Sequence, residues 1–398
     1  MVASQLCNCT MRVAMDATPL LGPRTGIGRY VAALAGALAG SAGPEPEEVA
    51  LIPFSWRGTG DLPAVAPEGP RVRFGRRRVP ARLLQAAWAR LPWPPVEWLA
   101  GPVDVFHATN FVAPPARRAA TVVTIHDLTY LRHPEMVSHA SARYRDLVPR
   151  ALARGAVVCT PTAAVGAEVA QEYRLAPERL VVTPLGVGEV WRQAAPPDPA
   201  WLAGHGLPER YLLFVGSREP RKNLPTLLAA YRELLAGVRG AAGGPASGPG
   251  AGAVPPLVLV GPPGWGAAVD IAGLPPEALR TPGYLPEDDL VRVVAGASAL
   301  VFPSWYEGFG LPALEALACG TPVVAADLPA LREVLGDQAE LVAPGDAAAL
   351  ADAIARVLDD PGGEPAAAAR RTRAAGFTWE SCAQATLSAY HRALEAGR

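Results

Sequence analysis

Short apolar runs alternate with longer amphipathic stretches along most of the chain. Strands are predicted at residues 12–17, 49–54, 103–107, 122–126, 157–160 and 181–183, and again at 211–215, 257–261, 299–302 and 322–325. Helices are predicted at residues 29–39, 224–235, 287–297 and 313–318. Buried parallel strands are continuously apolar and are joined through helices, so this order predicts an α/β protein with two Rossmann-like domains.

Proline-rich and glycine-rich segments divide this pattern into parts. The expected parts are a disordered N-terminal extension at 1–10, an N-terminal domain at 11–190, a linker at 191–205, a C-terminal domain at 206–375, and a C-terminal helix at 376–398 that packs back toward the N-terminal domain. Within the second domain, residues 237–256 are rich in Gly, Ala and Pro and predict a flexible insert.

Composition excludes several classes of protein. The 398 residues carry 36 basic and 37 acidic side chains, whereas a nucleic-acid-binding domain is usually clearly basic. The five cysteines are scattered without a CxxC pair, which supports neither a disulfide framework nor a zinc site. The first ten residues do not resemble a signal peptide, and no apolar run is long enough to span a bilayer. A cytoplasmic location is therefore expected.

The segment EGFGLPALE, from Glu307 to Glu315, carries the strongest chemical signal. It follows a predicted buried strand and opens a helix, so one carboxylate lies on a loop and the other about one turn into the helix. Gly308 and Gly310 let the backbone approach a ligand, and the free N–H groups of the helix terminus favour an anion. Carboxylates accept hydrogen bonds from sugar hydroxyls. The pattern therefore favours a binding site for a phosphorylated sugar over the alternative, a surface loop with two solvated acids.

A basic turn, GSREPRKN at Gly216–Asn223, directly follows another predicted strand. This position places Arg221 and Lys222 at the carboxyl edge of a parallel sheet, where ligands bind in open α/β folds. Lys222 is the only lysine among 36 basic residues. Where arginine fills nearly every basic position, a retained lysine indicates a need for its compact ammonium, although a solvated basic turn is the simpler alternative.

Two further segments are weaker signals. TGIGRY at Thr25–Tyr30 contains Gly-x-Gly, but the loop from Asp16 to Gly26 is too long for the tight turn of a dinucleotide site. His126 ends a predicted buried strand and is followed by Asp127. A histidine in that position is more often structural than catalytic.

Taken together, these segments closely resemble retaining glycosyltransferases of family 4, which have the GT-B fold: two Rossmann-like domains with parallel sheets facing across a cleft. The Glu-x7-Glu spacing is the hallmark of that family. The resemblance extends over residues 11–395 and includes TGIGRY, HDL, EPRKN, LVLVGPPGWG, GYLPEDDL and ACGTPVVA.

The resemblance implies roles for individual residues. The residues implied in catalysis are Glu307, His126 and Lys222. Those implied in donor binding are Arg221, Arg218, Gly308, Phe309, Gly310, Leu311, Glu315, Gly26 and Gly28. Those implied on the acceptor side are Arg29, Tyr30 and Asp127. Many family members have an arginine directly after the glycine where this chain has Ser217, which puts the role of Arg218 in doubt.

The activity implied is retaining transfer of a sugar from a nucleotide-sugar donor to a glycan or lipid-linked acceptor. EPRKN and GPPGWG resemble bacterial mannosyltransferases, so GDP-mannose is the expected donor, with UDP- and dTDP-sugars as alternatives. No cofactor is expected, and no metal, because the chain lacks an Asp-x-Asp motif. A non-catalytic nucleotide-sugar-binding protein stays open. The Glu-x7-Glu pair and the long first loop disfavour an NAD-dependent oxidoreductase.

A basic and aromatic segment has two interpretations. The arginines are Arg71, Arg73, Arg76, Arg77, Arg78 and Arg82, and the tryptophans that follow are Trp88, Trp93 and Trp98. Such a segment suits the surface of an anionic membrane, which would suggest peripheral contact with the cytoplasmic face. The favoured interpretation is a solvated edge with the tryptophans packed inside the N-terminal domain.

Overall fold

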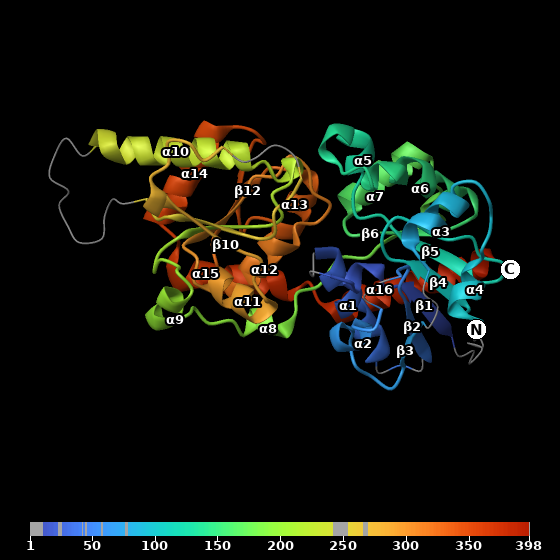
Figure 1. Ribbon diagram of the computed structural model, residues 1–398. Coiled ribbons are helices and arrows are strands. Elements are labelled where there is room, and N and C mark those ends of the chain that lie inside the picture. The colour runs from blue at the N-terminus through green and yellow to red at the C-terminus, as the bar shows by residue number, and fades with distance from the viewer. Residues whose placement is uncertain are drawn as a thin grey trace, which may run out of the picture. The chain divides into compact units, whose positions relative to one another are not determined.

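The computed structural model describes residues 11–22, 26–41, 43, 46–56, 59–75, 79–241, 254–265 and 270–397, apart from the side chains of 81–82 and 238–241. The chain forms two compact units (Figure 1). Unit 1 takes the described residues up to Arg132, those of His139–Gly186, and those from Thr378 onward. Unit 2 consists of His133–Ser138 and Val187–Phe377. The predicted extension 1–10, the centre of the predicted insert, and Arg76–Arg78 lie outside the described residues.

Unit 1 is built on a parallel sheet. Its strands in the described part of the chain are β1 Arg12–Asp16, β2 Glu48–Ile52, β3 Val72–Phe74, β4 Val105–Ala108, β5 Ala120–Thr124, β6 Val157–Thr160 and β7 Leu180–Val182. Their order across the sheet is β3-β2-β1-β4-β5-β6-β7, and Met15 of β1 pairs with His107 of β4. The chain therefore reverses its direction of winding between β1 and β4, the point at which such sheets bind ligands.

Helices cover the sheet of unit 1. They are α1 Gly26–Ala39, α2 Leu62–Val65, α3 Ala81–Trp88, α4 Val96–Ala100, α5 Thr129–Arg132, α6 Tyr144–Ala153, α7 Ala163–Tyr173 and α16 Trp379–Ala396, with the 3-10 helices η1 Thr18–Leu20, η3 Ser141–Arg143 and η4 Pro177–Arg179. The last helix, α16, packs against α1, β5 and β6, so the red end of the chain lies beside the blue beginning in Figure 1.

Unit 2 repeats the arrangement. Its described strands are β8 Leu212–Val215, β9 Leu257–Val260, β10 Leu279–Gly283, β11 Ala299–Phe302, β12 Val323–Ala326 and β13 Glu340–Val342, all parallel, in the order β10-β9-β8-β11-β12-β13. Its helices are α8 Glu189–Arg192, α9 Pro199–Gly204, α10 Leu224–Ala241, α11 Glu287–Ala295, α12 Leu311–Cys319, α13 Pro329–Leu335, α14 Ala347–Asp359 and α15 Gly363–Ala375, with η2 Pro134–Met136, η5 Pro220–Lys222 and η6 Pro276–Ala278. The winding reverses between β8 and β11.

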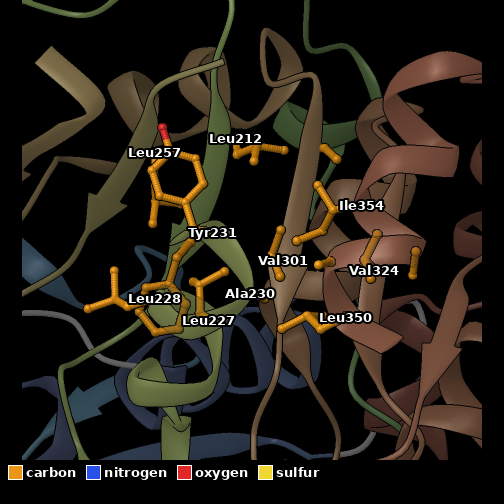
Figure 2. Close-up of a cluster of buried hydrophobic side chains, with 14 of the residues drawn as sticks. Leu212, Leu227, Leu228, Ala230, Tyr231, Leu257, Val301, Val324, Leu350 and Ile354 are labelled. Atoms are coloured by element: carbon orange, nitrogen blue, oxygen red, sulfur yellow. The ribbon is translucent and has the colours of Figure 1, made fainter. Parts of the chain in front are cut away.

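The core on one face of the unit 2 sheet shows why these apolar runs fold as they do. Tyr231 on α10 lies beside Leu257 on β9, and Ile354 on α14 lies beside Val301 on β11 (Figure 2). The hydroxyl of Tyr231 donates to the carbonyl oxygens of Pro255 and Ala278, so this large ring is buried without an unpaired polar atom. The two helices therefore cover strands that are apolar on both faces.

The sequence predicted two parallel α/β sheets, and that prediction is confirmed, but several boundaries differ. Strands β3, β10 and β13 were missed, because these edge strands include charged residues or a proline. Helix α10 continues to Ala241, five residues into the segment predicted to be flexible. The predicted linker, residues 191–205, lies within unit 2, where it holds the end of α8 and the whole of α9.

Candidate functional site

The site in unit 2 lies at the carboxyl ends of β8 and β11. These strands are neighbours, with Leu213 opposite Leu300, and the chain winds in opposite directions on either side of them. The loop after β8 supplies Arg221 and Lys222, and the loop after β11 supplies Glu307. Two segments 85 residues apart in sequence are therefore brought together where an open α/β sheet binds its ligand.

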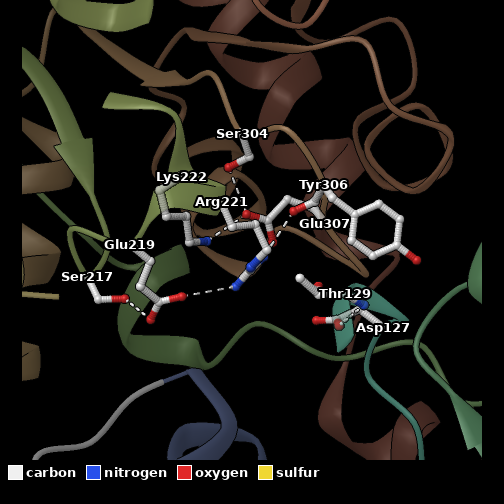
Figure 3. Close-up of polar contacts among 9 residues, drawn as sticks. All are labelled: Asp127, Thr129, Ser217, Glu219, Arg221, Lys222, Ser304, Tyr306 and Glu307. Carbon is white, nitrogen blue, oxygen red and sulfur yellow. Dashed lines mark hydrogen bonds and ion pairs between the residues drawn. The ribbon is translucent and has the colours of Figure 1, made fainter. Parts of the chain in front are cut away.

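Glu307 is the centre of a buried ion cluster (Figure 3). Its Oε1 accepts hydrogen bonds from Lys222 Nζ at 2.6 Å and from Ser304 Oγ at 2.8 Å. Its Oε2 lies 2.9 Å from Nη1 of Arg221. Lys222 also lies over the ring of Phe302, with its Nζ 4.7 Å from the ring centroid. One carboxylate thus holds two cations from the opposite loop.

A second carboxylate balances the cluster. Glu219 Oε2 lies 3.8 Å from Arg221 Nη2, and Ser217 Oγ donates to Glu219 Oε1. Arg221 Nη1 also donates to the carbonyl oxygen of Tyr306 at 3.0 Å. With two cations and two carboxylates, the four charged groups of the cluster sum to zero, and these contacts hold the guanidinium of Arg221 between the two loops.

The electrostatics keep Glu307 ionised. Burial alone would raise the pKa of this carboxyl, but Arg221 and Lys222 overcome that effect and lower the pKa to about 2. Burial lowers the pKa of the Lys222 ammonium, and the carboxylate of Glu307 opposes this shift. At neutral pH Glu307 is therefore an anion that accepts hydrogen bonds and does not supply a proton.

The local sequence explains how the two loops meet. Pro220 starts the short η5 helix, and Asn223 ends it in the left-handed region at φ 55°. Asn223 Nδ2 donates to the carbonyl oxygen of Pro303 at 3.0 Å, and Trp305 N donates to the carbonyl oxygen of Arg221 at 2.9 Å. Asparagine is one of the few residues that tolerate this conformation, so Asn223 both turns the chain and ties the loops together.

At two positions of this site a neighbouring residue lies so close to the backbone that only glycine fits. Gly310, at φ 87°, precedes α12, and a Cβ there would clash with Leu331. Gly264, in the loop after β9, lies so close to the backbone of Arg218 that a Cβ would overlap it. Arg218 thus contributes a backbone packing surface and is not a member of the ion cluster drawn in Figure 3.

The remaining predicted donor residues of unit 2 lie along α12 and its entrance. Gly308 and Leu311 are buried, and the ring of Phe309 packs edge-on against Phe377 at 5.9 Å. Glu315 is buried on the first turns of α12. Sequence and structure agree that these residues form one strand–loop–helix segment, with the side chain of Phe309 pointing into the apolar interior.

The predicted residues of unit 1 gather near the carboxyl end of β5. His126 follows that strand by two residues, so the prediction that it ends the strand was wrong; β5 stops at Thr124. His126 Nε2 donates to the carbonyl oxygen of Thr109 at 2.9 Å. Burial lowers the pKa of the ring, against the opposing effects of this bond and of Asp127. The ring is therefore neutral at pH 7, with its proton on Nε2.

The neighbours of His126 divide into a loop residue and core residues. Asp127 Oδ1 accepts from Thr129 N at 2.9 Å and opens α5. Tyr30 is buried, lies edge-on to His126 at 5.1 Å, and its hydroxyl bonds to Thr124 Oγ1 at 2.9 Å. Tyr30 therefore supports the His126 ring from within the core.

The glycine segment of unit 1 is helical, whereas the helix was predicted to begin at residue 29. Helix α1 begins at Gly26, so Gly26 and Gly28 both lie in its first turn, and Arg29 is half-buried beside them. A Cβ at Gly28 would lie 2.6 Å from the carbonyl oxygen of Pro19. This glycine lets α1 pack closely against the preceding 3-10 helix, which explains why a turn residue occurs inside a helix.

Two buried polar side chains of unit 1 were not predicted. Asp16 ends β1 and accepts from Thr18 N at 2.9 Å and Thr18 Oγ1 at 2.5 Å. Burial raises its pKa to about 6 despite these bonds. Asp16 stands at the switch point of this sheet, the same place that the ion cluster occupies in unit 2. A polar residue ending the first apolar strand was the signal that could have identified it.

The second buried polar side chain of unit 1 that was not predicted is His107 on β4, which is fully buried. Its Nδ1 bonds to the hydroxyl of Tyr390 on α16 at 2.9 Å, and its Nε2 to Thr124 Oγ1 at 2.7 Å. Burial, with a smaller effect from His126, lowers the pKa of His107 to about 3. This neutral imidazole connects α16 to the sheet and, through Thr124, to Tyr30.

The raised pKa of Asp16 leads to a testable pH dependence. A carboxyl whose folded-state pKa exceeds its unfolded value of 3.8 contributes stability that is complete below that value and is lost as pH rises through about 6. Relative to Asp16→Asn, the wild-type chain should lose about 2.4 kcal/mol of unfolding free energy between about pH 4 and pH 7. Denaturant unfolding of both proteins at the two pH values measures this.

Asp104→Asn is the matched control, because Asp104 is a more exposed carboxylate of the same unit, paired with Arg12. Its substitution should change stability by less than about 0.5 kcal/mol at either pH. A difference between wild type and Asp16→Asn that stays constant with pH would show that Asp16 is not the group responsible.

Two features are absent from the part of the chain that the structure describes. Within the described ranges, no three His, Cys, Asp or Glu side chains are arranged as a candidate metal-binding group. Among the helices that the structure describes, none combines the length and apolar character needed to cross a bilayer.

The fold defines the class of protein. The structure aligns with sucrose-phosphate synthase from Thermosynechococcus elongatus at a TM-score of 0.70 and 22% identity, covering 96% of this chain and 98% of that one. It also aligns with Anabaena HepE, solved in complex with UDP and glucose, at a TM-score of 0.63 and 17% identity, covering 95% and 98%. The fold is that of GT-B glycosyltransferases.

Sequence comparison then identifies the family. Residues 24–189 match the family described as Glycosyltransferase Family 4, and residues 209–360 match Glycosyl transferases group 1. The O-antigen chain mannosyltransferase B of Escherichia coli is 30% identical over 403 residues, which cover 96% of this chain and 99% of the relative. The chain belongs to glycosyltransferase family 4, as its Glu-x7-Glu spacing predicted.

Proposed function

We propose that this glycosyltransferase transfers mannose from GDP-mannose, with retention of configuration, to a glycan or lipid-linked acceptor. Unit 2 binds the donor, and unit 1 supplies the residues that bind the acceptor. The observation that carries the proposal is the Glu307 cluster: an ionised carboxylate and two cations, assembled at the switch point of the unit 2 sheet. The similarity to a mannosyltransferase over nearly the whole chain supports the choice of sugar.

The Glu307 carboxylate has capacity for a sugar hydroxyl. A carboxylate offers about four acceptor positions, and Lys222, Ser304 and Arg221 use three of them. The fourth accepts a hydroxyl of the donor sugar and so orients it. Two bound cations make this carboxylate a weak nucleophile, which favours a positioning role for Glu307 over formation of a covalent sugar intermediate.

The reaction requires stabilisation of a leaving diphosphate. The bond from the anomeric carbon to the diphosphate oxygen breaks while the acceptor oxygen bonds to the same face of that carbon, and the acceptor proton passes to the leaving diphosphate. Lys222 and Arg221 stabilise the negative charge that develops there, together with the N–H groups that open α12. These residues can stabilise the diphosphate without a metal ion, so we propose no metal and no cofactor.

Nucleotide preference is the direct test of the donor. GDP at about 100 times its Kd should add about 2.7 kcal/mol to the free energy of unfolding of the protein, whereas UDP, dTDP and ADP at the same concentration should add less. Thermal-shift assays in EDTA measure this, followed by assays of GDP release from GDP-mannose.

Stabilisation by UDP alone would show that the donor is a UDP-sugar instead of GDP-mannose, while the proposed enzyme class would stand. The complex of HepE with UDP and glucose makes this the leading alternative. Stabilisation by a nucleotide without turnover of any donor, across a panel of mannoside acceptors, would favour a non-catalytic nucleotide-sugar-binding protein.

A further inference from the structure

Unit 1 carries an exposed apolar surface between α3 and α4. Leu91, Trp93 and Trp98 are 59%, 56% and 43% exposed, and the two indole rings lie 6.4 Å apart. We call these three residues the Trp93–Trp98 surface. The prediction that the tryptophans pack inside the domain was correct only for Trp88, which is buried against Phe54. Two adjacent exposed tryptophans are costly in water, which points to a binding surface.

The segment that holds this surface is fixed to the domain. Trp88 Nε1 donates to the carbonyl oxygen of Pro94 at 3.0 Å. Val96 N donates to the carbonyl oxygen of Pro115 at 2.8 Å, and Val96 itself is buried. Because its neighbours are tied down on both sides, the Trp93–Trp98 surface is presented by a defined segment and is not the tip of a long loop.

The charges around the surface are predominantly positive. Arg90, Arg117 and Arg118 are exposed. Residues 89–119 contain two acids, Glu97 and Asp104. Glu97 Oε1 accepts hydrogen bonds from the backbone N–H groups of Arg117, Arg118 and Ala119 at 2.8–3.0 Å, and these bonds lower its pKa although burial opposes them.

Those bonds have two consequences. They stabilise the ionised form of Glu97, and they fasten the Arg117–Arg118 segment beside α4, which carries Trp98. The other acid, Asp104, pairs with Arg12. The three arginines outnumber the one acid that remains, Glu97, so the surface keeps an excess of positive charge for a partner.

We propose that the Trp93–Trp98 surface docks unit 1 onto an anionic lipid bilayer. Tryptophan prefers the headgroup region, where its ring is partly apolar and its N–H stays wet, and flanking arginines are attracted to acidic headgroups. A symmetric dimer through the same surface would bring the three arginines of each copy together, which disfavours that alternative. The inference goes beyond the proposed function, because lipid binding does not depend on the identity of the donor.

Vesicle binding tests the inference. The full chain should co-sediment with vesicles of equimolar phosphatidylglycerol and phosphatidylcholine, and its tryptophan emission should shift to shorter wavelength. The double variant Trp93→Ala, Trp98→Ala should bind at least about tenfold more weakly. Trp265→Ala is the matched control, since Trp265 is a 41% exposed tryptophan of unit 2, and it should bind like the wild type.

A second variant separates charge from apolar contact. Arg117→Gln with Arg118→Gln keeps the backbone N–H groups that bind Glu97 and should weaken binding to the anionic vesicles by about tenfold. GDP binding and the melting temperature of each variant show that both units remain folded.

The proposal is overturned if the wild type does not bind the anionic vesicles, or if the double tryptophan variant binds as well as the wild type. It is also overturned if sedimentation shows a dimer that the tryptophan variant abolishes while the vesicles stay unbound. The outcome is independent of the transfer assay, so failure here leaves the proposed activity standing.

Discussion

Glu307→Gln should lower the rate of sugar transfer by about a hundredfold to a thousandfold. An amide keeps the size of the side chain but loses the charge that holds Lys222 and Arg221 on opposite oxygens of Glu307. Removing one preorganised polar contact from a reacting centre commonly costs this much in turnover. The comparison is of kcat for wild type and variant with a donor that the wild type uses.

The same substitution should also cost stability. It leaves two buried cations with one remaining carboxylate, Glu219, and the loss of one partner from a buried ion pair costs about 3 kcal/mol. Circular dichroism should therefore show a lower melting temperature with an unchanged spectrum at low temperature. Glu340→Gln, an exposed carboxylate paired with Arg356, is the matched control and should change neither quantity. Wild-type turnover in Glu307→Gln would remove Glu307 from the active site.

Lys222→Arg should fail as a conservative substitution and lower turnover by about a hundredfold. The ammonium of Lys222 is buried between the Glu307 carboxylate and the ring of Phe302. A guanidinium is wider, planar and fixed in its hydrogen-bonding geometry, so it cannot take the same position without displacing the Glu307 side chain. Overpacking of a buried site adds a cost of about 1–3 kcal/mol.

Lys222→Met separates charge from shape. It keeps much of the volume but leaves Glu307 with Arg221 as its remaining cation, so the pKa of Glu307 should rise and activity should be lost as well. Arg356 forms an exposed ion pair with Glu340, so Arg356→Lys is the control for an arginine–lysine exchange outside the site. If Lys222→Arg were as active as the wild type, the occurrence of a single lysine among 36 basic residues would have no functional meaning.

The fold could be predicted from the sequence because each strand is indicated by its own short run of apolar residues. Continuous apolar runs such as residues 299–302 are typical of strands covered on both faces, and the two sheets follow from their order. The edge strand β7 was predicted, but β3, β10 and β13 were missed; β13, with the sequence ELV, is three residues long and carries a charge. Helix α1 was predicted to start at residue 29, three residues too late, because glycine is unfavourable in a helix and the close packing at Gly28 is not visible in the sequence.

The candidate site was predictable in its members but not in their pairing. Glu307 and Lys222 were identified from separate segments, and nothing in either segment states that they bond to each other 85 residues apart. Asp16 was missed although its place at the end of the first apolar strand was a signal, and His107 was missed because a single polar residue inside an apolar strand has no spacing pattern to identify it. The exposure of Trp93 was unpredictable for a similar reason, because tryptophan is common both inside proteins and at interfaces.

The return of α16 to unit 1 has a consequence for biosynthesis. The helix supplies Tyr390, which bonds to the buried ring of His107, although it follows the whole of unit 2 in the chain. Unit 2 is continuous from Val187 to Phe377 apart from the short His133–Ser138 segment, so all of it is synthesised before α16. Unit 1 is therefore completed only after unit 2 has been translated, and until then the part of unit 1 that α16 covers stays exposed.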